Sequence, residues 1–457
     1  MTWNPLAQAW NRRHFLATCG LGAARLALAA EPAFAPKAKR LIYLFMEGGP
    51  SQLDLFDHKP RLRADDGKPF PMSLLAGKKF AFMENMAAPT VQASSATFKP
   101  HGQSGNVVSS YLPHIASIAD KITIVRTLQT NNVNHSPAMV LAHTGFMVPG
   151  RPSLGAWLLY GLGNESKNLP SFISMISGPR GPRNGPDIWG AGFLPSSFQG
   201  VPFSPGPQPI FDVNSQPGVT TARQRRALDA LGDLNAERFA LTGDPEINTR
   251  IASYEMAFRM QASAPELMDI SSESQETLDL YGATPGKGSF ANNCLLARRL
   301  IERGVKVVQL YHTDWDHHTG IDKGLSKVCP EVDRPSAALI TDLSRRGLLN
   351  DTLVVWGGEF GRTPMSEGGK RGGLGRNHQI DAYTAWMAGG GVKPGITIGE
   401  TDDYGLKPIA DPIPIHDLHA TILHLFGFDH TKLTFRFQGR DFRLTDTAGA
   451  VVTKVLA

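Results

Sequence analysis

Cysteine is scarce in this chain, which has three among 457 residues. So few cysteines exclude a disulfide scaffold, and a chain of this length can bury a large core without one. Long apolar runs are also lacking after residue 35, because no segment there has the roughly 18 uninterrupted apolar residues of a membrane span. The composition excludes a disordered chain, a collagen and a coiled coil.

Charge of one sign is lacking as well. Lys and Arg number 46 against 41 Asp and Glu, which gives a formal charge of +5. Basic residues form no run longer than a pair, so we expect no nucleic-acid partner. What the chain does have is 14 histidines, unevenly distributed. Their distribution directs the search for a functional site.

The first 35 residues have the layout of a signal peptide. Arg12 and Arg13 precede a weakly apolar run, and small residues offer cleavage sites after Ala29 or Ala35. The arginine pair indicates a twin-arginine signal, so we expect export through the twin-arginine machinery to the periplasm or beyond. This route exports folded proteins and suits one that must first acquire a metal. Residues 1–35 contain three Arg and one Glu, so their removal lowers the charge from +5 to about +3.

Apolar runs of strand length then alternate with helical patterns. We expect strands at residues 40–46, 121–125, 305–311, 352–356 and 382–388, and helices at 136–142, 153–160, 290–303, 333–348 and 417–426. This alternation predicts an α/β fold, with a large central, mostly parallel sheet flanked by helices on both faces.

We expect the mature chain, residues 36–457, to form one domain whose strand–helix alternation is interrupted once. Residues 178–216 are rich in Gly, Pro, Asn and Ser, and two helical segments follow at 221–241 and 244–261. Because these elements break the strand–helix alternation, we expect a cap or insertion at about 178–290.

Ionisable residues gather in the loops that follow the predicted strands. Since the carboxyl ends of parallel strands share one edge, most of these loops should converge there, and the loop around His378 must wrap back to join them. A divalent cation is the simplest counter-charge, and Asp with His suits Zn or Mn better than Ca. The candidate ligands for one or two ions are Asp54, His135, Asp314, Asp316, His318, Glu359 and His378.

If two ions are bound, each would be coordinated by a different subset of these ligands. Asp314 or Asp316 can reach one ion together with His318, while a second ion could take Asp54, His135 and Glu359. Ions about 4 Å apart clamp the attacking and leaving oxygens of an ester displacement. Arg126 and Arg362 could bind an anionic substrate or pair with these carboxylates. His416, His419 and His424 follow helical spacing, and packing is the simpler role for them.

Several ordered motifs resemble the exported family called domain of unknown function 1501 (DUF1501). They include Glu47-Gly-Gly-Pro-Ser-Gln-Leu-Asp-Leu-Phe-Asp57, His143-Thr-Gly145, Trp315-Asp-His-His318, Glu359-Phe-Gly-Arg-Thr-Pro364 and Asp417-Leu-His-Ala-Thr-Ile-Leu-His-Leu-Phe-Gly427. The resemblance covers nearly the whole chain after about residue 39. It implies an alkaline phosphatase-like, sulfatase-like fold with a metal site at the strand ends.

The sulfatase nucleophile motif is altered in this chain. Counting back from Thr144-Gly145 places His135 where that motif has its nucleophilic Cys or Ser, and Met139 where it has Arg. A formylglycine nucleophile is therefore not expected. The nucleophile could be water activated by the metal, with His135 as a ligand. The adjacent Ser136 and a phosphohistidine on His135 are alternatives.

Two functions remain open from the sequence. The first is an exported metal-dependent hydrolase of phosphate or sulfate esters, acting on an anionic small molecule or glycan, with His135, Ser136, Arg126 and Arg362 as catalytic candidates. The second is a non-catalytic periplasmic binding or assembly protein that retains the sulfatase-like fold.

Overall fold

The computed structural model describes residues 31–78, 80–81, 89–163, 168–203, 218–368 and 373–457. The first 30 residues of the predicted signal peptide lie outside this part of the chain. Within it, no helix combines the length and apolar character needed to cross a membrane.

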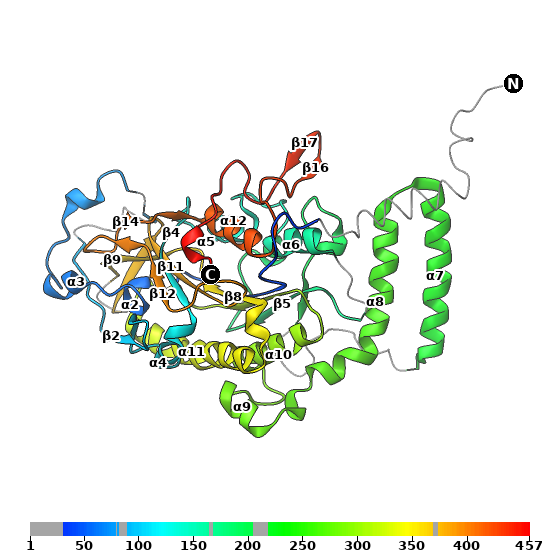
Figure 1. Ribbon diagram of the computed structural model, residues 1–457, viewed down its shortest axis with the longest axis horizontal. Coiled ribbons are helices and arrows are strands. Elements are labelled where there is room, and N and C mark those ends of the chain that lie inside the picture. Colours follow the sequence, from blue (N-terminus) through cyan, green and yellow to red (C-terminus); the bar gives the residue numbers. More distant parts are fainter. Residues whose placement is uncertain (1–30, 79, 82–88, 164–167, 204–217, 369–372) are drawn as a thin grey trace.

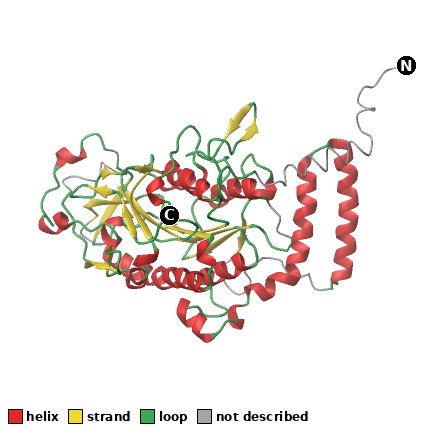
Figure 2. Ribbon diagram, viewed as in Figure 1, coloured by secondary structure: helices red, strands yellow, loops and turns green. Residues whose placement is uncertain are grey.

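A nine-stranded sheet runs through the middle of the described molecule (Figures 1 and 2). Its strands, in spatial order, are β12 (Ile396–Ile398), β4 (Thr123–Gln129), β11 (Tyr383–Ala388), β8 (Thr352–Gly357), β1 (Arg40–Met46), β7 (Val307–His312), β5 (Phe172–Ser177) and β6 (Val201–Phe203). The ninth strand, β15 (Ile413–Pro414), pairs with β4. Only β11 runs against its neighbours, so the predicted mostly parallel α/β sheet is confirmed.

Helices cover both faces of this sheet, as predicted. In β1, Ile42 and Leu44 point into a core shared with one group of helices, and Leu41 and Tyr43 point into the opposite core. The first group comprises α4 (Pro113–Ser117), α10 (Phe290–Glu302) and α11 (Ile321–Arg345). The second comprises α5 (His135–Thr144), α6 (Leu154–Leu162) and α12 (Ile415–Leu425). Alternate burial on both sides explains why β1 is apolar from Leu41 to Met46.

Short elements surround the carboxyl ends of the strands. They are α2 (Gln52–Leu55), α3 (Pro60–Ala64), β2 (Phe98–His101), β3 (Asn106–Ser109), β9 (Gly361–Gly368), β10 (Leu374–Gln379), β13 (Glu400–Thr401) and β14 (Pro408–Ala410). The hairpin β16 (Phe435–Phe437) and β17 (Arg440–Phe442) projects from the molecule (Figure 1). Strands β9 and β10 were predicted as loops, and their antiparallel pairing returns His378 to the sheet edge.

Two long helices stand beside the sheet, within the segment predicted as a cap or insertion. They are α7 (Thr221–Thr242) and α8 (Pro245–Met268), followed by α9 (Gln275–Tyr281). Helix α8 packs against α10 and the short 3-10 helix Ser196–Phe198, and the pair stands to the side of the molecule beyond β5 (Figure 1).

Candidate metal centre

Four side chains converge at the carboxyl edge of the sheet. His135, Asp316, His318 and His378 each offer one ligand atom, and these atoms lie within 4.8 Å of one another. Asp316 is central, with Oδ2 3.0 Å from Nε2 of His135 and Oδ1 3.1 Å from Nε2 of His318 and 3.5 Å from Nε2 of His378. Helix α5, the loop after β7 and strand β10 supply the four residues.

Two of the imidazoles are held from behind by glutamates. Nδ1 of His135 lies 2.6 Å from Oε1 of Glu359, and Nδ1 of His318 lies 2.8 Å from Oε2 of Glu367. A carboxylate accepts, so each Nδ1 carries a proton, and each Nε2 faces Asp316, where it would bind an ion in its deprotonated form. This carboxylate–histidine arrangement is the one that orients metal-binding imidazoles.

The third imidazole is held by the backbone. Nδ1 of His378 donates to the carbonyl oxygen of Val133 at 2.5 Å. Burial lowers the pKa of His378 to about 3, so its imidazole is neutral at pH 7. The Nε2 atoms of His135 and His378 are buried and make no well-aligned hydrogen bond. Three oriented imidazoles and one carboxylate fit Zn²⁺ or Mn²⁺.

The loop that carries Asp316 is pinned to the end of β1. The amide of Trp315 donates to the carbonyl of Glu47 at 3.2 Å, and the Trp315 side chain is buried. A Cβ on Gly48 would lie 2.6 Å from the amide nitrogen of Asp316, so only glycine allows this approach. The Gly48-Gly49 turn therefore fixes where Asp316 can lie.

Arg362 supports Asp316 from inside the protein. It is fully buried, and its Nη2 donates to Asp316 Oδ1 at 2.8 Å. Its other side-chain hydrogen bonds go to the carbonyls of Gly48, Gly49, Trp315 and Arg376. Burial raises the pKa of Asp316, but the three imidazoles and Arg362 outweigh it and hold that pKa well below its usual range. Arg362 therefore positions a carboxylate and does not face incoming substrate.

Two arginines that the sequence analysis did not select reach the cluster from the solvent side. Nη1 of Arg180 and Nη1 of Arg183 lie 2.9 and 2.7 Å from Oε1 of the buried Glu47, and Nη2 of Arg183 lies 3.1 Å from Oδ2 of Asp316. Their side chains remain 40% and 32% exposed. They belong to the Gly- and Pro-rich stretch 178–216, where the arginine-containing repeat GPRGPR was the available signal.

Burial and the neighbouring Glu359 raise the pKa of Glu47, while Arg180 and Arg183 act in the opposite direction. The second carboxylate oxygen of Glu47 is buried and has no hydrogen-bond partner among the described residues. Glu47 thus anchors the arginine pair next to the cluster.

Three predicted metal ligands lie outside the four-residue cluster: Glu359 holds His135 from behind, and Asp54 and Asp314 are engaged elsewhere. Asp54 accepts hydrogen bonds from Ser51 at 2.5 Å and from Arg376 Nε at 2.8 Å. Asp314 points to the other side of its loop, where Lys327 Nζ lies 2.8 Å from Oδ2. Within the described contacts, the structure brings neither carboxylate to the four clustered side chains.

The remaining catalytic candidates do not join the four clustered residues in the described contacts. Arg126 Nε lies 4.0 Å from Oδ1 of Asp57, which is a different carboxylate from those of the cluster. Ser136 follows His135 at the start of α5, is exposed, and accepts a hydrogen bond from Asn184 Nδ2 at 2.8 Å.

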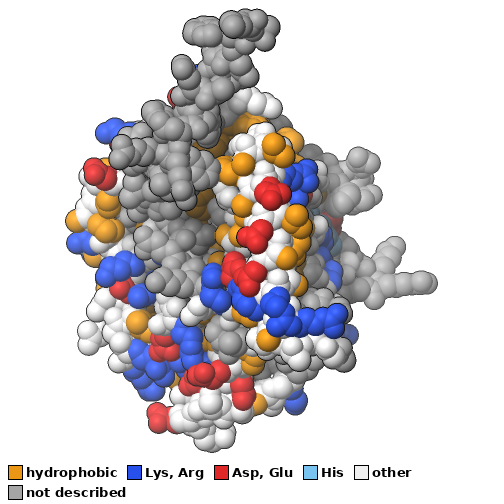
Figure 3. Space-filling model, turned by 90° about the vertical axis from the view of Figure 1, so that its right-hand side faces the viewer, with side chains coloured by type: hydrophobic (Ala, Val, Ile, Leu, Met, Phe, Trp, Pro, Cys, Tyr) orange, Lys and Arg blue, Asp and Glu red, His pale blue; other side chains and the backbone are white. Residues whose placement is uncertain are grey.

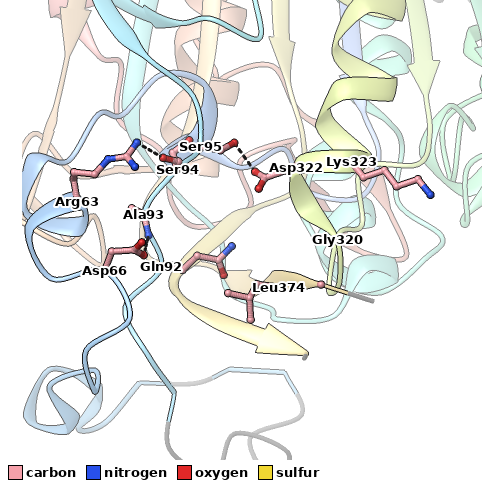
Figure 4. A pocket seen from close by; sticks show the side chains of 11 residues that line it. Arg63, Asp66, Gln92, Ala93, Ser94, Ser95, Gly320, Asp322, Lys323 and Leu374 are labelled. Carbon is pink, nitrogen blue, oxygen red and sulfur yellow. Dashed lines mark hydrogen bonds between the residues drawn. The ribbon is translucent and has the colours of Figure 1, made fainter. Parts of the chain in front are cut away.

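A shallow hollow lies beside the loop of His318. It has a volume of about 510 Å³ and is lined by residues that include Arg63, Ser95, Asp322 and Leu374 (Figure 4). Ser95 donates to Asp322 at 2.7 Å across its wall. None of the four clustered residues lines this hollow, which is therefore separate from the candidate metal centre.

Comparison with known proteins yields distant structural likenesses. A sulfatase from Pseudoalteromonas sp. is 11% identical, with a TM-score of 0.36 over 90% of this chain and 70% of its own. A phosphonate monoester hydrolase from Silicibacter pomeroyi is 11% identical, with a TM-score of 0.33 over 85% of this chain and 73% of its own. The alkaline phosphatase from the Antarctic bacterium TAB5 is 12% identical, with a TM-score of 0.32 over 85% of this chain and 98% of its own.

No curated protein sequence matches the chain. Residues 38–456, however, match the family described as "Protein of unknown function (DUF1501)". The match spans nearly everything after the predicted signal peptide and agrees with the ordered motifs in the sequence. The chain therefore belongs to the DUF1501 family.

Proposed function

We propose that this chain is a metal-dependent hydrolase of phosphate or sulfate esters. The observation that carries the proposal is the convergence of three imidazole Nε2 atoms on one carboxylate, with each Nδ1 fixed by an acceptor behind it. His135, Asp316, His318 and His378 would hold the ion. The chemistry such an ion supplies is polarisation of an ester oxygen and activation of water.

The protein's own residues prepare this site. Glu359 and Glu367 keep the proton of His135 and His318 on Nδ1, so no reorientation is needed when an ion binds. Arg362 fixes the Asp316 carboxylate from the buried side. One His₃Asp site accounts for these contacts, so we propose one ion.

The arginine pair supports an anionic ester as the substrate. Arg180 and Arg183 are held by Glu47 through one Nη atom each, and the partly exposed guanidinium group of Arg183 also contacts Asp316. Guanidinium groups bind phosphate and sulfate oxygens with paired hydrogen bonds. We infer that they orient the anionic group of a small molecule or glycan ester beside Asp316.

Metal content and esterase activity test this proposal together. The purified protein is expected to contain Zn or Mn and to hydrolyse chromogenic phosphate or sulfate esters. His318→Gln should lower both metal affinity and turnover by about a hundredfold or more, because it removes a ligand. His317→Gln is the matched control, since His317 is in the same loop but outside the cluster.

Two outcomes contradict the proposal. Metal bound equally by wild type and His318→Gln would remove the cluster as the metal site. A metal-loaded protein with no turnover on either ester class would favour the non-catalytic binding or assembly protein instead.

Ser136→Ala separates water from serine as the nucleophile. Asn184 donates to the Ser136 hydroxyl, and no side-chain base bonds to that hydroxyl within the described residues. We therefore expect Ser136→Ala to retain turnover. Loss of turnover with normal metal content would assign the attack to Ser136.

We also propose export by the twin-arginine route, on the basis of Arg12, Arg13 and the apolar run that follows. Arg12→Lys/Arg13→Lys is expected to trap the precursor inside the cell. Cell fractionation measures this, and unchanged export of the variant would reject the route.

A further inference from the structure

The helical pair beside the sheet presents a second apolar face that no described residue covers. Helix α7 packs on α8, and none of the residues of α7, all of which the structure describes, is buried. Figure 3 faces this side of the molecule and shows hydrophobic side chains along the helices, with basic groups at the lower end and acidic groups above them.

One face of α7 is already used by α8. The guanidinium of Arg225 forms an ion pair with Glu255 at 2.5 Å and lies 5.2 Å from the ring centroid of Phe258. Leu228 is half-buried one turn further along the same face. These contacts join α7 to α8, and they do not involve the second apolar stripe.

The second stripe follows a heptad. Leu231, Leu234 and Leu241 are exposed by 44%, 63% and 87%, and Ala227 and Arg238 complete a spacing of 4, 3, 4 and 3 residues. Such a seam is typical of a helix that packs against another helix. The 22 residues of α7 form a rod about 33 Å long, which holds three heptads.

The charges beside the stripe would complement those of a second copy of the helix only if the two helices are antiparallel. Arg223 and Arg226 flank its beginning, and Asp233 and Glu237 flank its second half. Arg226 and Glu237 form no ion pair with any described residue of the chain. An antiparallel second copy would place Glu237 beside the basic turn of its neighbour, whereas a parallel copy would place like charges together.

Side-chain sizes agree with the antiparallel orientation. When Leu231 of one copy faces Leu234 of the other, the same register places Arg238 opposite Ala227. The small alanine leaves room for the arginine stem to lie along the seam and carry its charge to solvent. We propose that two copies of this chain associate through α7, antiparallel across a twofold axis between Leu231 and Leu234.

The oligomeric state of the full chain tests the proposal. Analytical ultracentrifugation of the wild type should show a monomer–dimer equilibrium in the micromolar range. Leu231→Glu/Leu234→Glu should raise the dimer dissociation constant at least about thirtyfold, because it places charges in the centre of the seam. Both positions are exposed in the single chain, so we expect normal folding and metal content.

Ile409→Glu is the matched control. Ile409 is 58% exposed on strand β14, comparable with Leu234, and lies outside α7. Its replacement should leave the dissociation constant unchanged. A wild type that stays monomeric to about 100 μM, or a dimer that both variants leave intact, would overturn the proposal.

Cysteine cross-linking tests the orientation in a Cys19→Ser background, in which the remaining Cys294 and Cys329 are buried. Leu231→Cys/Leu234→Cys should form a disulfide-linked dimer under mild oxidation. Leu241→Cys, far from the axis, should not. Cross-linking of Leu241→Cys as well as the central pair would indicate a parallel dimer and reject the proposed axis.

Discussion

At the scale of single residues, the partner of each ring nitrogen decides what a histidine of this chain can do. His135 and His318 have Nδ1 on a carboxylate and Nε2 directed at Asp316. His143 and His419 instead donate one ring nitrogen to a helix carbonyl inside the core, and the other nitrogen is buried without a hydrogen-bond partner among the described residues. The first arrangement prepares a ligand, and the second fixes a neutral packing residue.

The glutamate behind His318 should tune metal affinity. Glu367→Gln replaces the charged acceptor at Nδ1 with a neutral amide, which makes the imidazole a weaker ligand and its orientation less certain. We expect metal affinity to fall by about tenfold to a hundredfold, the usual effect of such outer contacts. A competition titration with a chelator of known affinity measures it.

Glu331→Gln is the control for this variant. Glu331 bonds to His312 at 2.8 Å, the same distance as between Glu367 and His318, but His312 lies outside the cluster. Equal metal affinities of the two variants would mean that Glu367 does not act through His318.

Acid stability should depend on His419. Burial lowers the pKa of His419 to about 3, whereas the unfolded residue titrates near 6.5. Below pH 6.5 the unfolded chain binds a proton that the folded chain does not, so stability falls as the pH decreases. From pH 7 to pH 5 this single residue should remove about 2 kcal/mol from the free energy of unfolding.

His419→Gln removes that titration and keeps a side-chain amide that can donate to the Ala142 carbonyl, as Nε2 does at 2.8 Å. Its free energy of unfolding in urea should therefore change less between pH 7 and pH 5 than that of the wild type, by about 2 kcal/mol. Identical pH dependences would show that His419 is not neutral in the folded core.

At the scale of elements, the end of α5 limits how the helix that carries His135 can be placed. Gly145 caps α5 at φ 69°, and a Cβ there would collide with the carbonyl oxygen of Leu444. Gly243 caps α7 at φ 65° but has open space around its Cβ position. The two glycines share a conformation and differ only in their surroundings.

Alanine at these two caps should therefore have unequal effects. Gly243→Ala meets only the left-handed backbone penalty of about 1 kcal/mol. Gly145→Ala adds a backbone collision and should lower the free energy of unfolding by about 3 kcal/mol or more. Urea unfolding measures the free energy of unfolding of both variants. Equal decreases would mean that the backbone around Leu444 moves away from the new Cβ without an energetic penalty.

Much of the fold was predictable because its strands are buried on both faces. The apolar run of β1 was predicted with its observed bounds, and the helix predicted at 153–160 is α6, which Ser153 caps. Helix α11 begins at Ile321, earlier than the predicted residue 333, because it accommodates Pro330 and Pro335. Strand β11 is antiparallel, and strand direction leaves no local pattern in a run that is buried throughout.

The site was predictable only where its residues follow strands. Four predicted ligands come together, because His135, Asp316 and His318 follow the carboxyl ends of strands and His378 returns on the β9–β10 hairpin. Glu367 was missed because glycines and a proline made β9 look like a loop. Arg180 and Arg183 were missed because they lie in a Gly- and Pro-rich stretch. Tertiary packing, which the local sequence does not reveal, decides which part of that stretch faces the sheet edge.

At the scale of the whole molecule, the candidate metal centre joins parts of the chain that are far apart in sequence. His135 begins α5, Asp316 and His318 follow β7, and His378 lies on β10. An unfolded chain cannot keep these ligands within 4.8 Å of one another. A metal ion that binds the folded state alone must therefore stabilise the entire domain by mass action.

Metal addition should accordingly raise the free energy of unfolding of the wild type, by about 4 kcal/mol when free metal exceeds its dissociation constant a thousandfold. Urea titrations of metal-loaded and chelator-treated protein measure the difference. His378→Gln should show a much smaller shift, of about 1.4 kcal/mol for a hundredfold weaker metal affinity, because one of the three converging imidazoles is gone. His317→Gln should keep the full shift. Two outcomes would contradict this expectation: a wild type whose free energy of unfolding does not change with metal, or a His378→Gln variant that keeps the full wild-type shift. Either would mean that the cluster is held by its internal ion pairs alone, with Asp316 neutralised by Arg362 and protonated imidazoles.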